Sequence, residues 1–192
     1  MDLDAAAFTL GGLRMYPLAV TTRSGDTANG LIALSGGSGS IVADAPRAMI
    51  GLSKYNLTHD LVMSSGVFAM HLLAADPPEA LDASLSIVMA LGASSGRDGD
   101  KLSTLATKDG VTGSPILIDA LAYVEGRVVN SMDCDENTVF LADVVAAERL
   151  RDGHRLNVGD AWKALPSEWL EKYERNHAPQ AADARQRRGL EA

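Results

Sequence analysis

Short apolar segments separated by glycine-containing turns are the feature that most limits how this chain can fold. Few helical segments interrupt them before residue 150, and a Gly36–Ser40 run (GGSGS) breaks regular structure early on. The predicted strands cover residues 13–23, 27–35, 48–52, 67–73, 116–130 and 138–149. Strands of this number and length with few helices predict a mainly β domain, built as an antiparallel barrel or sandwich.

Two helices are expected among these strands. The first begins near Thr58 and ends at Gly66, since glycine is the usual left-handed cap of a helix. The second opens at Pro77-Pro78-Glu79 and carries Leu81, Leu85, Val88 and Met89 on one face.

The C-terminal part differs in composition. Both tryptophans fall there, and Trp162, Trp169, Leu170 and Tyr173 form an apolar stripe expected to dock on the barrel or on a second subunit. Residues 178–192 have little to bury, which predicts a disordered tail. The expected organisation is an N-terminal arm (1–12), a barrel domain (13–150), a helical extension (151–177) and this tail.

The charge balance restricts the partners. Asp and Glu number 25 against 17 for Lys and Arg, giving a formal charge of −8. Nucleic acids and anionic membranes need a basic face, so neither is an expected partner. The start, Met1-Asp2-Leu3-Asp4, has no features of a secretory signal, and no apolar run is long enough to span a bilayer. We therefore expect a cytoplasmic protein.

The stretch Ser53-Lys54-Tyr55-Asn56-Leu57-Thr58-His59-Asp60 predicts an anion site. It places a cation, an amide and a hydroxyl just before the helix expected from Thr58. Helix N-termini have unpaired N–H groups and partial positive charge, which suit a phosphate. Such a run is also typical of a simply capped loop, and the spacing is not that of a P-loop.

A second segment, Asn29-Gly30-Leu31-Ile32-Ala33-Leu34-Ser35, lies about 25 residues earlier. It reads as a turn followed by a strand with small residues, where a flat aromatic group could lie against the backbone. Together the two segments suggest a planar, phosphorylated cofactor.

The histidines and the single cysteine predict neither a metal site nor a catalytic nucleophile. His71 lies in an apolar strand and is predicted to be a core residue bonded to backbone, whereas His59 could touch a phosphate or substrate. No histidine pair has the spacing of a metal helix. The only cysteine, Cys134, excludes an internal disulfide, and its acidic neighbours argue against a reactive thiolate.

The order of several segments resembles a known family. The segments begin with Tyr16–Thr22, Asn29-Gly30 with the strand to Ser35, Ala45-Pro46 before an apolar strand, Ser53-Lys54-x-Asn56-x-Thr58, and Ser65-Gly66-x-Phe68. They end with Gly99-Asp100-Lys101 and the strand Thr138–Val144, so the series covers roughly residues 13–150. This succession resembles the flavin reductase-like family of FMN-binding split barrels.

The resemblance implies a six-stranded antiparallel Greek-key split barrel with flanking helices, forming a homodimer with FMN near the subunit interface. The strand would lie along the isoalloxazine ring, the loop would hold the ribityl phosphate, and Lys101 would approach the flavin. The implied cofactor-binding residues are Asn29, Gly30, Leu31, Ile32, Ala33, Ser35, Ser53, Lys54, Asn56, Thr58, His59 and Lys101.

The implied activity is hydride transfer from NADH or NADPH to FMN, with reduced flavin passed to a flavin-dependent monooxygenase. No side chain is needed as a catalytic acid or base, because the cofactor carries the chemistry. Ile32 stands where the family usually has Thr, and Asn137 stands where reductases often have His. An FMN carrier or a structural subunit is therefore the alternative. Pyridoxamine-phosphate oxidases and deazaflavin-dependent enzymes share the same architecture.

Overall fold

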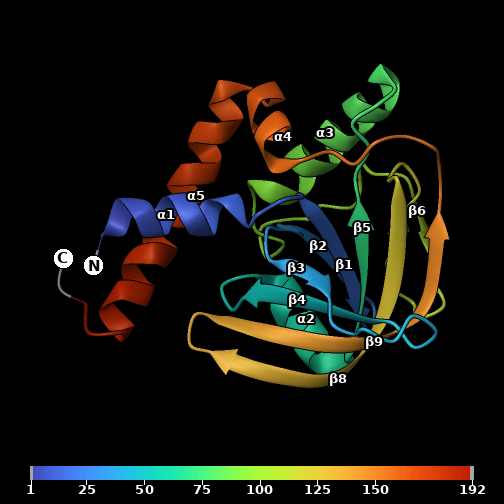
Figure 1. The fold of residues 1–192 in the computed structure, drawn as a ribbon, viewed down its shortest axis with the longest axis horizontal. Coiled ribbons are helices and arrows are strands. Elements are labelled where there is room, and N and C mark those ends of the chain that lie inside the picture. The colour runs from blue at the N-terminus through green and yellow to red at the C-terminus, as the bar shows by residue number, and fades with distance from the viewer. Residues whose placement is uncertain (1, 191–192) are drawn as a thin grey trace.

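The apolar segments pair into one curled antiparallel sheet that forms a half-barrel (Figure 1). The computed structural model describes residues 2–190. The sheet order is β2-β1-β5-β8-β9-β4-β3, and β6 and β7 form a separate pair. The strands are β1 (Leu18–Ser24), β2 (Thr27–Ala33), β3 (Gly36–Ser38), β4 (Arg47–Ser53), β5 (Val67–Leu72), β6 (Thr107–Asp109), β7 (Pro115–Leu117), β8 (Ala122–Cys134) and β9 (Asn137–Arg149). The predicted mainly β antiparallel architecture is confirmed.

The main sheet has seven strands among residues 2–190, not the six that were expected. The additional strand is β3, which lies in the glycine-rich run predicted only to break regular structure. It pairs with β4, matching Gly36 to Ile50. A Cβ at Gly36 would lie 2.7 Å from Leu18 Cδ1 and 2.8 Å from Ile50 Cδ1, so a residue without a side chain lets this strand approach the core.

The long hairpin of β8 and β9 gives the sheet its curl. Its register shifts between Glu125 and Gly126 and again between Val128 and Asn130. Such irregularities bend strands and increase their twist, so each long strand can pass from one side of the half-barrel to the other. The acidic turn Asp135–Glu136 joins the two strands.

The interior of the half-barrel is an apolar core closed at one end by α2 (Leu57–Ser65). Phe68, Phe140 and Ile50 are fully buried there, and Val62 of α2 joins them. Gly66 ends α2 with φ 68°, the left-handed cap that the sequence predicted.

A second apolar layer covers the outer face of β1 and β2. It contains α3 (Pro78–Gly92), α4 (Val158–Ala164) and the start of α5 (Ser167–Arg187). Trp169 donates its indole N–H to the Met89 carbonyl at 3.1 Å and stacks on Tyr173. The stripe thus packs within its own chain, on α3 and on the apolar layer that includes Ala28 and Ile32 of β2.

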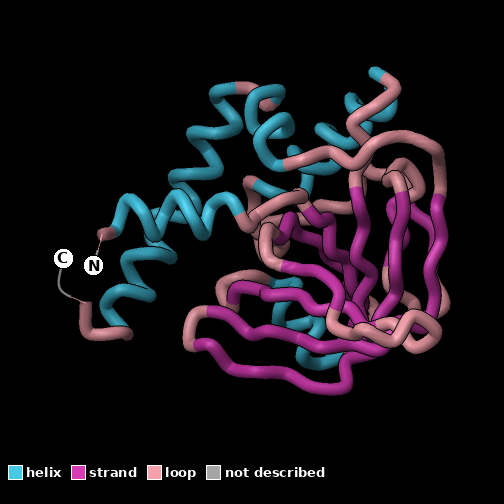
Figure 2. Tube along the Cα trace, viewed as in Figure 1, coloured by secondary structure: helices cyan, strands magenta, loops and turns pink. Residues whose placement is uncertain are grey.

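The two terminal helices lie to one side of the sheet (Figure 2). The arm 1–12 contains α1 (Leu3–Gly12), which has no buried residue. Helix α5 continues to Arg187, whereas the sequence predicted a disordered tail from residue 178; residues 191 and 192 of that tail lie outside the described chain. The extra turns are anchored because Asp183 and Arg187 both contact the hydroxyl of Tyr55. No helix within residues 2–190 is long and apolar enough to cross a membrane.

Candidate functional site

The first turn of α2 presents unpaired backbone donors. Asn56 occupies the N-cap position, but its side chain makes no capping hydrogen bond. Within residues 2–190, the backbone N–H groups of Leu57 and Thr58 have no hydrogen-bond acceptor. Unpaired amides at the positive end of a helix favour an anion, the kind of ligand that the sequence indicated here, although Thr58 itself is fully buried.

Lys54 brings the cation to this turn, but it is already paired. Its Nζ lies 2.6 Å from Asp133 Oδ1 at the tip of the β8–β9 hairpin. The hydrogen bond from Lys54 is the main reason that the pKa of the Asp133 carboxyl lies below its usual value. Ser53 pairs across the sheet with Asn137. The loop and the hairpin turn therefore lie next to each other.

Asn29 and Thr58 satisfy each other instead of facing solvent. Asn29 Nδ2 donates to Thr58 Oγ1 at 2.9 Å, and both side chains are buried. Gly96 covers them, since a Cβ there would lie 2.4 Å from the Asn29 amide. Thr58 was predicted to cap the helix or to bind an anion through its hydroxyl; in the structure Asn56 is the cap residue, and the Thr58 hydroxyl serves Asn29.

His59 also points into the protein. Its Nε2 lies 2.9 Å from Thr138 Oγ1 and its Nδ1 lies 3.1 Å from Asp60 Oδ1, and 7% of the residue is exposed. This side chain ties α2 to β9. The structure gives it these partners, whereas the sequence suggested a phosphate or a substrate.

The edge of the sheet supplies backbone groups. Strand β2 pairs only with β1 along residues 27–33 and is the last strand on that side of the sheet. Alternate N–H and C=O groups of an edge strand face away from its neighbour. Leu31 and Ala33 bury their side chains in the core, while Ser35 is exposed and its carbonyl accepts from Gly51 N at 2.8 Å.

A pocket of about 470 Å³, here the lateral pocket, opens beside this edge strand and the turn of α2. Its walls are mostly polar and come from four parts of the chain. They are β2 (Leu31, Ile32), the loop before α2 (Tyr55, Asn56), the end of α3 with the following loop (Leu91, Gly92, Ala93, Ser94, Ser95, Asp98), and α5 (Lys172, Tyr173, Asn176, His177, Gln180). The structure thus brings Leu31, Ile32 and Asn56 of the predicted set to one cavity.

Helix α5 was missed as a wall of this pocket. Asn176 Nδ2 donates to the Ala93 carbonyl at 2.8 Å, which holds the helix over the opening. The residues that face the pocket recur at positions 173, 176, 177 and 180. This is the spacing of one helix face. It was not recognised because Tyr173 was assigned to the apolar stripe and Gln180 to a disordered tail.

Arg97 is a second residue that sequence analysis missed. Its guanidinium donates to the Tyr55 carbonyl at 2.9 Å and to Asp60 Oδ2 at 2.6 Å. It therefore braces the loop before α2 from the side of the 94–100 loop. No motif marks it, because only the fold brings these two loops together.

Lys101 lies behind the pocket wall. Its Nζ donates to the Ser94 carbonyl at 3.0 Å, and burial lowers the pKa of its ammonium group to about 8. The residue lines a smaller cavity of about 260 Å³ together with Ser94 and Ser95, which also line the lateral pocket. In the structure Lys101 orders the wall that carries these serines.

The donor set of this region fits a phosphorylated flavin. The Leu57 N–H at the helix terminus, the Asn56 side-chain amide and the Lys54 ammonium suit a dianion, and the adjoining pocket has an edge strand for a planar group with its own donors and acceptors. The size of the pocket is within the usual range of ligand sites, roughly 300–1,000 Å³. The residues present therefore match the cofactor that the resemblance implied.

A curled antiparallel half-barrel with such a site at its open edge defines the class of flavin-binding split-barrel oxidoreductase domains. The model of the flavin reductase like domain matches residues 15–161. The chain therefore belongs to the flavin reductase-like family, as the order of motifs indicated.

Named relatives agree with this assignment. The chain is 29% identical over 157 residues to a high molecular weight rubredoxin of Moorella thermoacetica, covering 77% of this chain. It is 30% identical over 110 residues to a ferric-chelate reductase (NAD(P)H) of Archaeoglobus fulgidus, covering 57% of this chain. The matches span 65% and 62% of those two proteins, so this chain corresponds to a part of each.

A solved structure shows the same fold. The FMN-binding protein of Thermus thermophilus, crystallised with p-hydroxybenzaldehyde, superposes with a TM-score of 0.61 at 25% identity. The match covers 70% of this chain and 71% of that protein.

Proposed function

We propose that the protein binds FMN in the lateral pocket and reduces it with NADH or NADPH. The observation that carries this proposal is that the loop before α2 (Tyr55, Asn56) and the edge strand β2 (Leu31, Ile32) line one cavity. When bound, FMN would supply the redox chemistry by accepting hydride from the nicotinamide.

The loop before α2 would hold the phosphate. In the described part of the chain, the Leu57 N–H and the Asn56 side-chain amide are unpaired donors, and Ser53 and Lys54 lie beside them. Binding a dianion here would compete with Asp133 for Lys54. Thr58, Asn29 and His59 would act indirectly, by fixing the helix start in place.

The edge strand would bind the ring system. Backbone groups of Gly30 to Ala33 and of Ser35 would meet its polar rim, and donors there would stabilise negative charge as it develops on reduction. Ile32 supplies an apolar contact where the family usually has a hydroxyl. Lys101 would support this wall through Ser94.

The proposal also includes the oligomeric state, the acceptor of reduced flavin and the location of the protein. We expect a homodimer, since α1 leaves Leu3, Phe8 and Leu10 largely exposed, and a flavin-dependent monooxygenase as the acceptor of reduced flavin. A cytoplasmic location is part of this proposal.

Anaerobic titration tests the activity. The purified protein with FMN is titrated with NADH and then, separately, with NADPH while the flavin absorbance is followed. Bleaching by either nucleotide, faster than with FMN alone, supports a reductase. Absence of bleaching with FMN demonstrably bound contradicts it.

Asn137 favours a second function, that of an FMN carrier. It lies next to Ser53 in the sheet, where the resemblance indicated a reductase histidine. The variant Asn137→His separates the two functions. A carrier would bind FMN without bleaching, and the histidine variant would gain nucleotide-dependent bleaching.

A further inference from the structure

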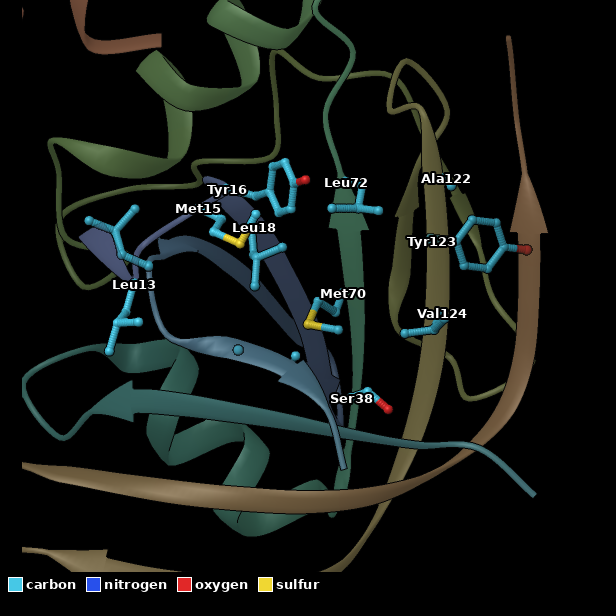
Figure 3. Close-up of a pocket in the computed structure, with 13 residues that line it drawn as sticks. Leu13, Met15, Tyr16, Leu18, Ser38, Met70, Leu72, Ala122, Tyr123 and Val124 are labelled. Carbon is cyan, nitrogen blue, oxygen red and sulfur yellow. The ribbon is translucent and has the colours of Figure 1, made fainter. Parts of the chain in front are cut away.

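The half-barrel has a second cavity at the end away from α2. Helix α2 closes the end where Ser64 meets Ser24, the last residue of β1. At the other end, where β1 begins, an apolar chamber of about 420 Å³ remains (Figure 3). Its walls include Leu18, Met70, Leu72 and Val124, which extend the barrel core to this opening.

A neighbouring chamber of about 530 Å³ continues this cavity outward. The two chambers share Tyr16, Leu72 and Ala122, so they form one groove, here the barrel-mouth groove. The outer rim carries Arg149, His154 and Arg155. The groove therefore runs from an apolar interior to a cationic mouth.

Two of the three basic side chains at the rim are already paired. His154 Nδ1 lies 2.6 Å from Asp76 Oδ2, and Arg149 Nη2 lies 3.0 Å from Asp152 Oδ1. Within residues 2–190, the Arg155 guanidinium has neither an ion pair nor a hydrogen bond, and the Tyr16 hydroxyl also lacks a partner. Among these residues no carboxylate lines either chamber. An anion in the mouth would meet one unpaired cation and one free hydroxyl.

We infer that the barrel-mouth groove binds a monocarboxylic acid with an extended apolar body. The apolar body would fill the inner chamber against Leu18, Met70 and Val124. The carboxylate would lie in the outer chamber, where Arg155 provides the charge and Tyr16 a hydroxyl donor. Charge complementarity favours an acid over a neutral apolar molecule, and each chamber alone is as large as common ligand sites, roughly 300–1,000 Å³.

This site is separate from the lateral pocket. The two cavities share no lining residue, and the loop 53–60 borders only the lateral pocket. The inference does not depend on FMN binding.

Calorimetric titration tests the inference. Decanoate, below its micelle-forming concentration, is compared with 1-decanol, which has the same chain without the charge. We expect decanoate to bind more tightly. Arg155→Ala should raise its dissociation constant roughly tenfold, the size of one charge-assisted hydrogen bond, and leave 1-decanol unchanged. Lys163→Ala removes another exposed cation, which lines neither chamber, and should change neither value.

A second variant tests the apolar chamber. Ala122→Phe places a large side chain at the junction of the two chambers and should abolish binding of both molecules, with the fold checked by thermal unfolding. Equal affinity for decanoate and 1-decanol, no binding of decanoate, or an unchanged affinity in Arg155→Ala would overturn the inference. The other possible occupant of the groove is a second copy of the chain, which sedimentation velocity would detect as a dimer. The inference would also be overturned if Ala122→Phe disrupted such a dimer and the unaltered protein bound no decanoate.

Discussion

Asn29 of the edge strand β2 donates a hydrogen bond to Thr58 in the first turn of α2, at 2.9 Å and with both side chains buried. This bond joins the two segments that the sequence analysis singled out. It fixes the helix terminus relative to the sheet edge, so the anion donors and the strand keep one geometry. The two residues therefore act as the frame of the proposed site.

Thr58→Val should test this frame. Valine keeps the shape but leaves the buried Asn29 amide without its acceptor, which costs about 1–3 kcal/mol of unfolding free energy. Urea unfolding measures the change. Thr9→Val is the matched control, since it removes an exposed hydroxyl that bonds Ala5, and it should cost well under half as much. Equal losses of unfolding free energy in the two variants would show that the Asn29–Thr58 hydrogen bond stabilises the protein no more than an exposed one.

Gly96→Ala should disturb the same pair from the outside. The added Cβ would lie 2.4 Å from the Asn29 amide, so the amide or the loop must move, at a cost of about 1–3 kcal/mol. Gly99→Ala in the same loop meets no atom within 4 Å and serves as the control. FMN binding should weaken in Gly96→Ala and not in Gly99→Ala. Unchanged FMN binding and stability in Gly96→Ala would contradict the packing of Gly96 on Asn29.

Asp133→Asn should strengthen FMN binding. The carboxylate holds Lys54 at 2.6 Å, and removing its charge leaves the ammonium free for a phosphate. We expect the dissociation constant of FMN to fall severalfold and that of riboflavin to stay unchanged, measured by flavin fluorescence quenching. Weaker FMN binding would show that Asp133 positions Lys54 rather than competing for it.

The His71 side chain should remain neutral at pH values far below the usual pKa of histidine. Its Nδ1 lies 2.9 Å from the Ala19 carbonyl and its Nε2 accepts from Leu117 N, and burial lowers its pKa from 6.5 to about 4. The unfolded chain therefore takes up this proton first. The corresponding stability, of the order of 3 kcal/mol, is complete above pH 6.5 and is lost as the pH falls toward 4. Imidazole nitrogen shifts measured against pH would contradict this if His71 titrated near 6.5.

Much of the fold was predictable because its determinants are local. Most of the strand runs, the Gly66 cap and the core position of His71 follow from residue type and spacing, and the structure confirms them. The single strand predicted over residues 116–130 is wrong, because this stretch is divided between β7 and β8, which belong to different sheets. Strand β3 was not predicted because its formation depends on the fit of Gly36 between Leu18 and Ile50, residues far away in sequence.

The site was predictable in part for the same reason. The turn of α2 and the edge strand carry their own signals, so both were identified. The roles of Thr58 and His59 depend on Asn29 and Thr138, and the wall formed by α5 depends on Tyr55 and Ala93. These are tertiary contacts, which no local pattern encodes.

The most direct test of the flavin site compares FMN with riboflavin in Lys54→Ala. The two ligands differ only in the phosphate, so loss of the loop cation should raise the dissociation constant of FMN about tenfold or more and change that of riboflavin less than about twofold. This result would place the phosphate at the start of α2. Equal weakening of both ligands, or no weakening of either, would contradict that placement.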